Sequence, residues 1–282
     1  MADPYPSLEK LERRRYPPYG SCIYCDALEG LTTEHIVPFG LGGTLELPDA
    51  SCLRCATETS RVERAILRGE LRPVRVFRAL QSRRKHKDAP STYPLAVVRD
   101  GVEVTVELPL DSYPILVPFP DFAPARLATG QPSKPGIDVA GIATVSFGAD
   151  PASVLRDLGA SAIKPSVSTH PAQFARMVAK IAFAMAAATG ALSLIKGPSP
   201  IRDVILGTNT HIGDYVGTLT YPLDAHAGQL HRTILLPDTN TGQLVADVQL
   251  FSDSYAPRYG VLLGELSDHV KAETGVRVDF SQ

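Results

Sequence analysis

The four cysteines of the chain form two C-x-x-C pairs, Cys22/Cys25 and Cys52/Cys55, and no other cysteine occurs. A C-x-x-C turn directs two thiolates at one ion, and two such turns supply the four soft ligands of a closed tetrahedral zinc site. The sequence therefore predicts a structural Zn²⁺ held by all four cysteines. The 26 residues between the pairs exceed what a bare zinc ribbon needs.

An acid and a histidine stand side by side in this interval, Glu34-His35, at the end of a strand-like run. Imidazole accepts a proton from water near neutral pH, and a carboxylate suits hard ions such as Mg²⁺ or Mn²⁺. On a regular strand the two side chains would point to opposite faces. Pro38 and Gly40 favour a break in the pleat that lets them converge. The pattern indicates a reactive centre between the two zinc-binding cysteine pairs, which together we call the zinc clip.

Three short elements must position these residues. Residues 31–37 and 45–47 read as strands joined by a loop at 40–44, and residues 53–67 read as a helix that stops near Gly69. The expected unit is strand, loop, strand and helix with zinc at one end.

Residues 20–68 resemble the zinc-stapled branch of the HNH endonuclease family. The resemblance rests on the order of the first C-x-x-C pair, Glu-His-Ile-Val-Pro at 34–38, Gly42-Gly43 and the second C-x-x-C pair. It implies a ββα-metal fold in which a histidine deprotonates water to attack a phosphodiester, while one Mg²⁺ or Mn²⁺ steadies the leaving oxygen. It assigns His35 as the general base and Glu34 as a ligand of the ion.

Two positions where many family members have a metal-binding or orienting Asn carry Leu47 and Ala56 here. At 100° per residue, Glu63 lies on the same side of the helix as Ala56, facing the expected hairpin. A carboxylate directed into an apolar seam needs a cation or several donors. We expect Glu63 to be the helix-borne ligand of the catalytic ion; the competing interpretation is an ion pair with an arginine from elsewhere.

Positive charge is concentrated just after the second cysteine pair. Residues 54–87 hold 11 Lys/Arg and 3 Glu, and 11 − 3 gives +8, although the whole chain carries −2. Such a stripe suits phosphate backbones of nucleic acid, DNA above all, without sequence reading; a merely solvated basic helix is the alternative. The expected contact residues are Arg54, Arg61, Arg64, Arg68, Arg83, Arg84 and Lys85.

The rest of the chain is mostly β. Residues 93–99 and 102–108 flank Asp100-Gly101, a strong hairpin signal. Proline-rich stretches between 114 and 135 suit loops or edge strands. Residues 171–189 form one long helix with a single apolar stripe for a sheet, and Lys180 is expected at its edge with its ammonium in water. Five further strands are expected at 203–206, 215–220, 233–236, 244–251 and 261–266.

The predicted fold class is α+β. An N-terminal HNH-like ββα-metal zinc domain with a basic extension spans residues 1–90, and residues 91–282 form an antiparallel sheet covered by one main helix. Hydrophobic residues make up 44% and charged residues 21% of the chain, as in ordinary globular proteins. Residues 1–15 lack a signal-peptide core, and the longest apolar stretch, 181–195, is too short for a bilayer. We expect a cytoplasmic protein without a membrane partner and consider a homodimer possible.

The leading functional prediction is a metal-dependent HNH-type endonuclease that hydrolyses nucleic-acid phosphodiesters, with DNA as the expected substrate. The alternative is a catalytically inactive zinc module that binds nucleic acid or protein, with Leu47 and Ala56 as its evidence. A third interpretation treats the zinc clip as a stability device and places the function in residues 91–282. His170, His211, His226 and His231 are expected in structural or surface roles.

Overall fold

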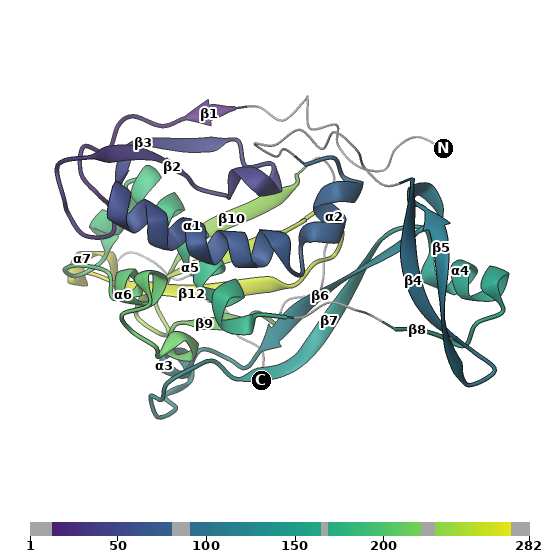
Figure 1. Ribbon diagram of the computed structural model, residues 1–282. Helices are drawn as coiled ribbons and strands as arrows, with labels where there is room; N and C mark the ends of the chain where they lie inside the picture. Colours follow the sequence, from purple (N-terminus) through teal and green to yellow (C-terminus); the bar gives the residue numbers. More distant parts are fainter. Residues whose placement is uncertain (1–12, 81–90, 165–168, 221–228, 272–282) are drawn as a thin grey trace.

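The structure is a computed structural model that describes residues 13–80, 91–164, 169–220 and 229–271 (Figure 1). It mixes helices with several small sheets, so the α+β class is confirmed. None of the helices in these ranges combines the length and the apolar character needed to cross a membrane. Arg83, Arg84, Lys85 and His226 lie outside the described residues.

The N-terminal unit has the expected order of strand, loop, strand and helix. Strand β2 (Leu31–His35) pairs antiparallel with β3 (Leu45–Cys52), and α1 (Leu53–Arg68) begins at the next residue. The short strand β1 (Arg14–Arg15) pairs with the other edge of β3. Strand β3 is longer than the predicted 45–47, because its pairing with β2 continues to Cys52. Helix α2 (Arg72–Phe77) follows α1.

A four-stranded antiparallel sheet, in the order β10-β11-β12-β9, forms the second layer. Its strands are β9 (Val216–Thr218), β10 (His231–Asp238), β11 (Gln243–Leu250) and β12 (Arg258–Glu265). Four of the five strands predicted in this region are therefore confirmed. The fifth prediction, a strand at 203–206, was wrong: α6 (Ile201–Leu206) is a helix that ends at Gly207 in a left-handed conformation. A short apolar run does not distinguish a strand from one buried helical turn.

The long helix α5 (Pro171–Ala188) lies between the N-terminal unit and this sheet (Figure 1). We expected one apolar stripe, but twelve of its 18 residues are buried. A helix that is apolar all round is one covered on more than one side. Here α1 covers one side and strands β10, β11 and β12 cover another. The helix is therefore the centre of the molecule rather than the cover of a sheet.

The remaining strands form two smaller sheets. Hairpin β4 (Thr92–Arg99) and β5 (Val102–Pro109) turns through Asp100 and Gly101, both at positive φ as a two-residue turn of this kind requires. Strand β8 (Ala162–Ile163) pairs with β4, and α4 (Pro151–Leu158) packs on this sheet. Among the described strands, the proline-rich β6 (Pro114–Phe122) pairs only with β7 (Val139–Gly148), which agrees with an edge strand. Figure 1 shows the β4–β5 hairpin with α4 to one side of the α5 layer.

The short helical segments connect these layers. They are α3 (Arg126–Thr129), α7 (Asp268–Lys271), η2 (Phe39–Leu41), η3 (Leu110–Ser112), η4 (Ala191–Leu194) and η5 (Ile212–Asp214).

The domain boundary near residue 90 stays a prediction, but the packing joins the two segments. One hydrophobic cluster contains buried residues from Tyr16 to Val270. Ion pairs also cross the boundary. Among them, Arg202 of α6 binds Asp26 at 2.7 Å, and Arg78 binds Asp253 at 2.9 Å. The Arg78 pair is buried on both sides, so α2 and the segment after β11 are tied together.

His231 makes a further connection, between β10 and the loop of the N-terminal hairpin. Its Nε2 lies 2.8 Å from the Leu41 carbonyl oxygen, and its Nδ1 accepts the Phe251 backbone N–H at 3.2 Å. These two contacts require a neutral ring with its proton on Nε2. Burial, more than the charge of nearby Arg78, lowers the pKa of His231 to about 4. His231 thus has the structural role that the sequence predicted.

We expect acidification to destabilise the fold through His231. The unfolded chain takes up a proton on this ring below about pH 6.5, whereas the folded chain resists until about pH 4. Stability is therefore lost as pH falls between these values, by roughly 2 kcal/mol from pH 7.5 to 5. Urea unfolding at both pH values should show a smaller loss for His231→Gln than for the parent. An equal loss in the two proteins would exclude this role.

Candidate metal centre and buried charge cluster

The four cysteines come together at one end of the N-terminal unit. Their Sγ atoms all lie within 4.8 Å of one another. Cys22 and Cys25 belong to a turn before β2, Cys52 ends β3, and Cys55 lies in the first turn of α1. The Cys25 and Cys52 sulfurs are 3.6 Å apart, well beyond the ~2.05 Å of a disulfide. The four thiols could hold a metal ion such as zinc.

Backbone hydrogen bonds shape the first cysteine turn. The Asp26 N–H donates to the Cys22 carbonyl, and the Cys22 N–H donates to Ala27, both at 2.8 Å. Burial raises the pKa of Cys25, but hydrogen bonds from the Ala27 amide and the Arg54 guanidinium outweigh it and lower this pKa to about 6. Burial raises the pKa of the Cys22 and Cys55 thiols. Buried thiolates need a positive partner, which a metal ion supplies by displacing the protons.

A second cluster of charged groups lies where β2, α1 and α5 meet. The Lys180 Nζ is 2.6 Å from Glu34 Oε1 and 2.9 Å from Glu63 Oε1. The exposed fractions of the three side chains are 2% for Lys180, 6% for Glu34 and 19% for Glu63. The sequence correctly placed Glu63 toward the hairpin, but its ion-pair partner is Lys180 rather than an arginine. Our expectation of Lys180 at the helix edge, with its ammonium in water, was wrong.

Backbone oxygens complete the surroundings of the ammonium. Lys180 Nζ also donates to the carbonyl oxygen of His35 and lies 3.4 Å from that of Ile36. Burial lowers the pKa of Lys180, but Glu34 and Glu63 outweigh it and raise this pKa above its ordinary value, so the ammonium keeps its charge at neutral pH. Burial raises the pKa of Glu34, more than Lys180 lowers it.

Two hydroxyl groups border the charge cluster. Tyr24, in the first cysteine turn, is close enough to Glu34 and Glu63 for both carboxylates to add to the effect of burial and raise its pKa. Its Oη is buried and has no hydrogen-bond partner among the described residues. Ser51 of β3 is fully buried next to Glu34. With two carboxylates and one ammonium, the cluster carries a formal charge of −1.

The structure places His35 beside this cluster through its backbone. Strand β2 has an irregular register between Thr32 and Glu34, so the pleat breaks upstream of the expected position. Glu34 is buried, whereas the His35 ring is half-buried and contacts Phe39, with 5.6 Å between ring centroids. Among the described residues, the cysteines are the one group of three or more ligand side chains close enough for a metal ion. Glu34, His35 and Glu63 do not form such a group.

A catalytic Mg²⁺ or Mn²⁺ is implied by the family resemblance, and the residues present fit it poorly. The two candidate ligands, Glu34 and Glu63, already share the ammonium of Lys180. The Asn-replacing residues add no donor atom, since Leu47 is buried in the core and Ala56 is aliphatic. The assignment of this ion to Glu34 and Glu63 stays a prediction.

The predicted nucleic-acid contacts on α1 divide into two kinds. Arg54 and Arg61 are exposed but have partners within the chain: Arg54 donates to the Cys25 sulfur, and Arg61 binds Glu58 at 2.8 Å. Arg64 and Arg68 are exposed, and neither has an ion-pair partner among the described residues. By helical geometry these two lie roughly 100° or more from Glu63 around the helix. The basic face and the charge cluster thus occupy different sides of α1.

Sequence reasoning missed Lys180 as a member of this site. The available signal was a single lysine within an apolar, alanine-rich helix, which is costly to bury without a partner. The partner residues come from positions 34 and 63, more than 100 residues earlier. Spacing along the chain carries no information about such a contact.

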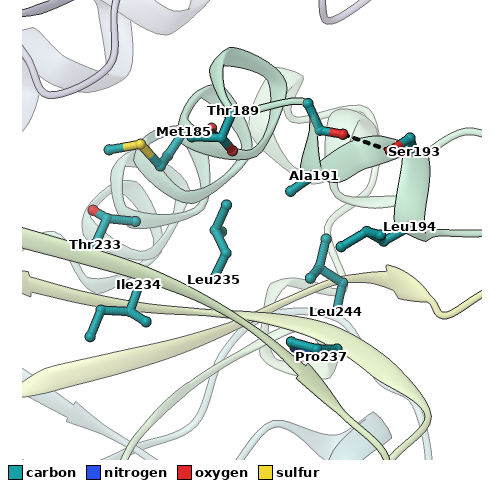
Figure 2. Close-up of a pocket in the computed structure, with 11 residues that line it drawn as sticks. Met185, Thr189, Ala191, Ser193, Leu194, Thr233, Ile234, Leu235, Pro237 and Leu244 are labelled. Carbon is teal, nitrogen blue, oxygen red and sulfur yellow. Dashed lines mark hydrogen bonds between the residues drawn. The ribbon is translucent and has the colours of Figure 1, made fainter. Parts of the chain in front are cut away.

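A shallow pocket lies elsewhere in the described part of the chain. It lies between the end of α5, the following η4 turn and strands β10 and β11, and encloses about 570 Å³ (Figure 2). Its lining is apolar or hydroxylic and contains no ionisable side chain. Figure 2 shows Met185 on the helix side of the pocket and Leu235 on the strand side.

Comparison with known proteins adds no family assignment. The chain matched no protein-family model, no curated protein and no solved structure.

We expect the cysteine site to bind one metal ion per chain and to stabilise the N-terminal unit. Cys52→Ser removes one of four ligands, and metal binding supplies folding free energy to such sites. The variant should lose bound zinc, measured by elemental analysis, and the cobalt-loaded parent should show the absorption of tetrahedral thiolate coordination. Leu53→Ser, at the exposed neighbouring residue, is the control and should keep the metal. A metal-free but folded parent would contradict the assignment.

We expect Lys180→Met to be strongly destabilising, because it leaves two carboxylates in the interior without their cation. Breaking a buried pair in this way costs about 3–5 kcal/mol. Urea unfolding at neutral pH measures the loss, and adding Glu34→Gln and Glu63→Gln to the same chain should recover part of it. Lys196 bridges Glu265 and Asp268 at the surface, so Lys196→Met is the matched control and should change stability little. Equal effects at the two lysines would contradict this account.

Proposed function

We propose that the chain is an HNH-like nucleic-acid-binding module, in which a zinc-type metal clip holds a β-hairpin against a basic helix. The partner is the phosphate backbone of nucleic acid, with DNA as the first candidate. The observation that carries this proposal is the basic face of α1, where Arg64 and Arg68 are exposed and have no ion-pair partner among the described residues.

The position of this face supports backbone binding. Arg61, Arg64 and Arg68 recur at helical spacing on the solvent side of α1, so their guanidinium groups follow one line along the helix. Arginine binds phosphate through two hydrogen bonds at once, and backbone contacts carry no direct sequence information. Helix α1 begins at the second cysteine pair, so the metal clip fixes the direction in which it presents these arginines.

The buried charge cluster favours binding over cleavage. In the nuclease mechanism that the resemblance implies, the acid of the Glu-His pair holds a divalent ion. Here Glu34 is bonded to Lys180 instead, and Leu47 and Ala56 lack ligand atoms. These features support the inactive alternative that the sequence left open.

A metal-dependent HNH endonuclease remains a second candidate, because Glu34 and Glu63 do converge next to the His35 backbone. In that proposal His35 is the general base, Glu34 and Glu63 hold Mg²⁺ or Mn²⁺, and hydrolysis of a DNA phosphodiester is the reaction. The His35 ring is half-buried and its Nδ1 is covered, so Nε2 would be the nitrogen that accepts the proton in this role.

Gel retardation of duplex DNA, with plasmid cleavage in Mg²⁺ or Mn²⁺, distinguishes the two candidates. We expect retardation without cleavage. Changing both Arg64 and Arg68 to Glu should weaken binding at least tenfold, since two phosphate contacts are replaced by repulsion. It should also lower the slope of log affinity against log salt by about 2, at roughly 0.9 per contact.

Arg156, exposed on α4, is the matched control, and Arg156→Glu should leave the affinity unchanged. Metal-dependent cleavage that His35→Ala abolishes would establish the endonuclease instead. Absence of both retardation and cleavage would reject both candidates and favour a function in the later part of the chain.

A further inference from the structure

The surroundings of the Lys180 ammonium are those of a bound cation. Two carboxylate oxygens, from Glu34 and Glu63, and the carbonyl oxygens of His35 and Ile36 all lie within 3.4 Å of Nζ. An all-oxygen set with two carboxylates is what a hard ion such as Mg²⁺ or Mn²⁺ also prefers. The lysine therefore occupies the position where the same four oxygens would hold such an ion.

The ammonium and a divalent ion cannot share this position. Each carboxylate already uses one oxygen for Lys180, and a divalent ion on the second oxygens would lie within a few ångströms of Nζ. Two like charges at that distance in a buried site repel strongly, because the interior screens charge poorly. Occupation by one cation thus opposes the other.

Lys180 also has no easy way to leave. It lies in the middle of α5, and its neighbours Ala179 and Ile181 are fully buried. The helix is covered by α1 on one side and by the sheet on another. Removing the ammonium would leave both carboxylates without a positive partner and would break its bonds to the β2 backbone.

We propose that Lys180 is a built-in cation that permanently takes the place of the divalent ion at Glu34 and Glu63. The parent protein then has one metal site, at the four cysteines, and no divalent-ion site in the charge cluster. The same oxygens become a divalent-ion site when the ammonium is removed. This inference concerns the charge cluster alone and does not depend on nucleic-acid binding.

Mn²⁺ binding tests the proposal directly. Mn²⁺ prefers oxygen ligands to thiolates, so it reports on the charge cluster in zinc-loaded protein. The free Mn²⁺ signal in electron paramagnetic resonance is followed for the parent, Glu63→Gln, Lys180→Ala and the double variant Lys180→Ala/Glu63→Gln. We expect the parent and Glu63→Gln to bind Mn²⁺ equally weakly. Lys180→Ala should gain one site at least tenfold tighter, and the double variant should lose it.

Lys196 provides the control, because its ammonium also bridges two acidic residues, Glu265 and Asp268, but at the surface. Lys196→Ala should gain no tight Mn²⁺ site. The proposal is overturned if Glu63→Gln weakens Mn²⁺ binding of the parent tenfold, or if folded Lys180→Ala binds no better than the parent. If Lys180→Ala does not fold, the comparison of the parent with Glu63→Gln tests the proposal. Equal Mn²⁺ affinity of these two proteins supports it, and weaker Mn²⁺ binding by Glu63→Gln rejects it.

Discussion

The buried ammonium of Lys180 is the interaction on which the arrangement of the central layers depends. Charges in a protein interior are tolerated only when they are paired and hydrogen-bonded. Lys180 meets that condition only if β2 brings Glu34 and the His35 carbonyl, and α1 brings Glu63, to the same point on α5. The need to pair these buried charges thus fixes the positions of β2, α1 and α5 relative to one another. Apolar packing alone does not impose this requirement.

The cysteine cluster lies at the other end of the same hairpin, where it would have a different structural role. A short hairpin and one helix bury little apolar surface, so small units of this kind need a further constraint. A metal ion held by the four thiols, which come from the turn before β2, the end of β3 and the start of α1, would supply it. Tyr24 lies near both features, because it belongs to the first cysteine turn and the charges of Glu34 and Glu63 add to the effect of burial in raising its pKa.

The HNH resemblance implies a zinc site and a catalytic-ion site in one unit. In this chain the cysteine cluster could hold a metal ion, whereas the charge cluster holds the ammonium of Lys180. The spacing of the cysteines and the Glu34-His35 pair carry that resemblance, whereas Lys180 of α5 lies between Glu34 and Glu63, the two side chains expected to hold the catalytic ion. The exposed arginines lie on another side of α1, away from that position. In the proposal of backbone binding, the cysteine site would fix the orientation of the basic helix, and Glu34 and Glu63 bind the Lys180 ammonium.

The sequence by itself determined the local features of this protein. The cysteine pairs, the hairpin, helix α1, the Asp100-Gly101 turn and the inward direction of Glu63 follow from spacing and residue type, which act over a few residues. Tertiary structure decided which cation Glu63 meets, why α5 is covered on more than one side, and that 201–206 is helical. Those outcomes depend on contacts between separate elements, of which the Glu63–Lys180 ion pair joins residues more than 100 positions apart. A lysine whose local surroundings suggested solvent is buried because two distant carboxylates compensate its charge.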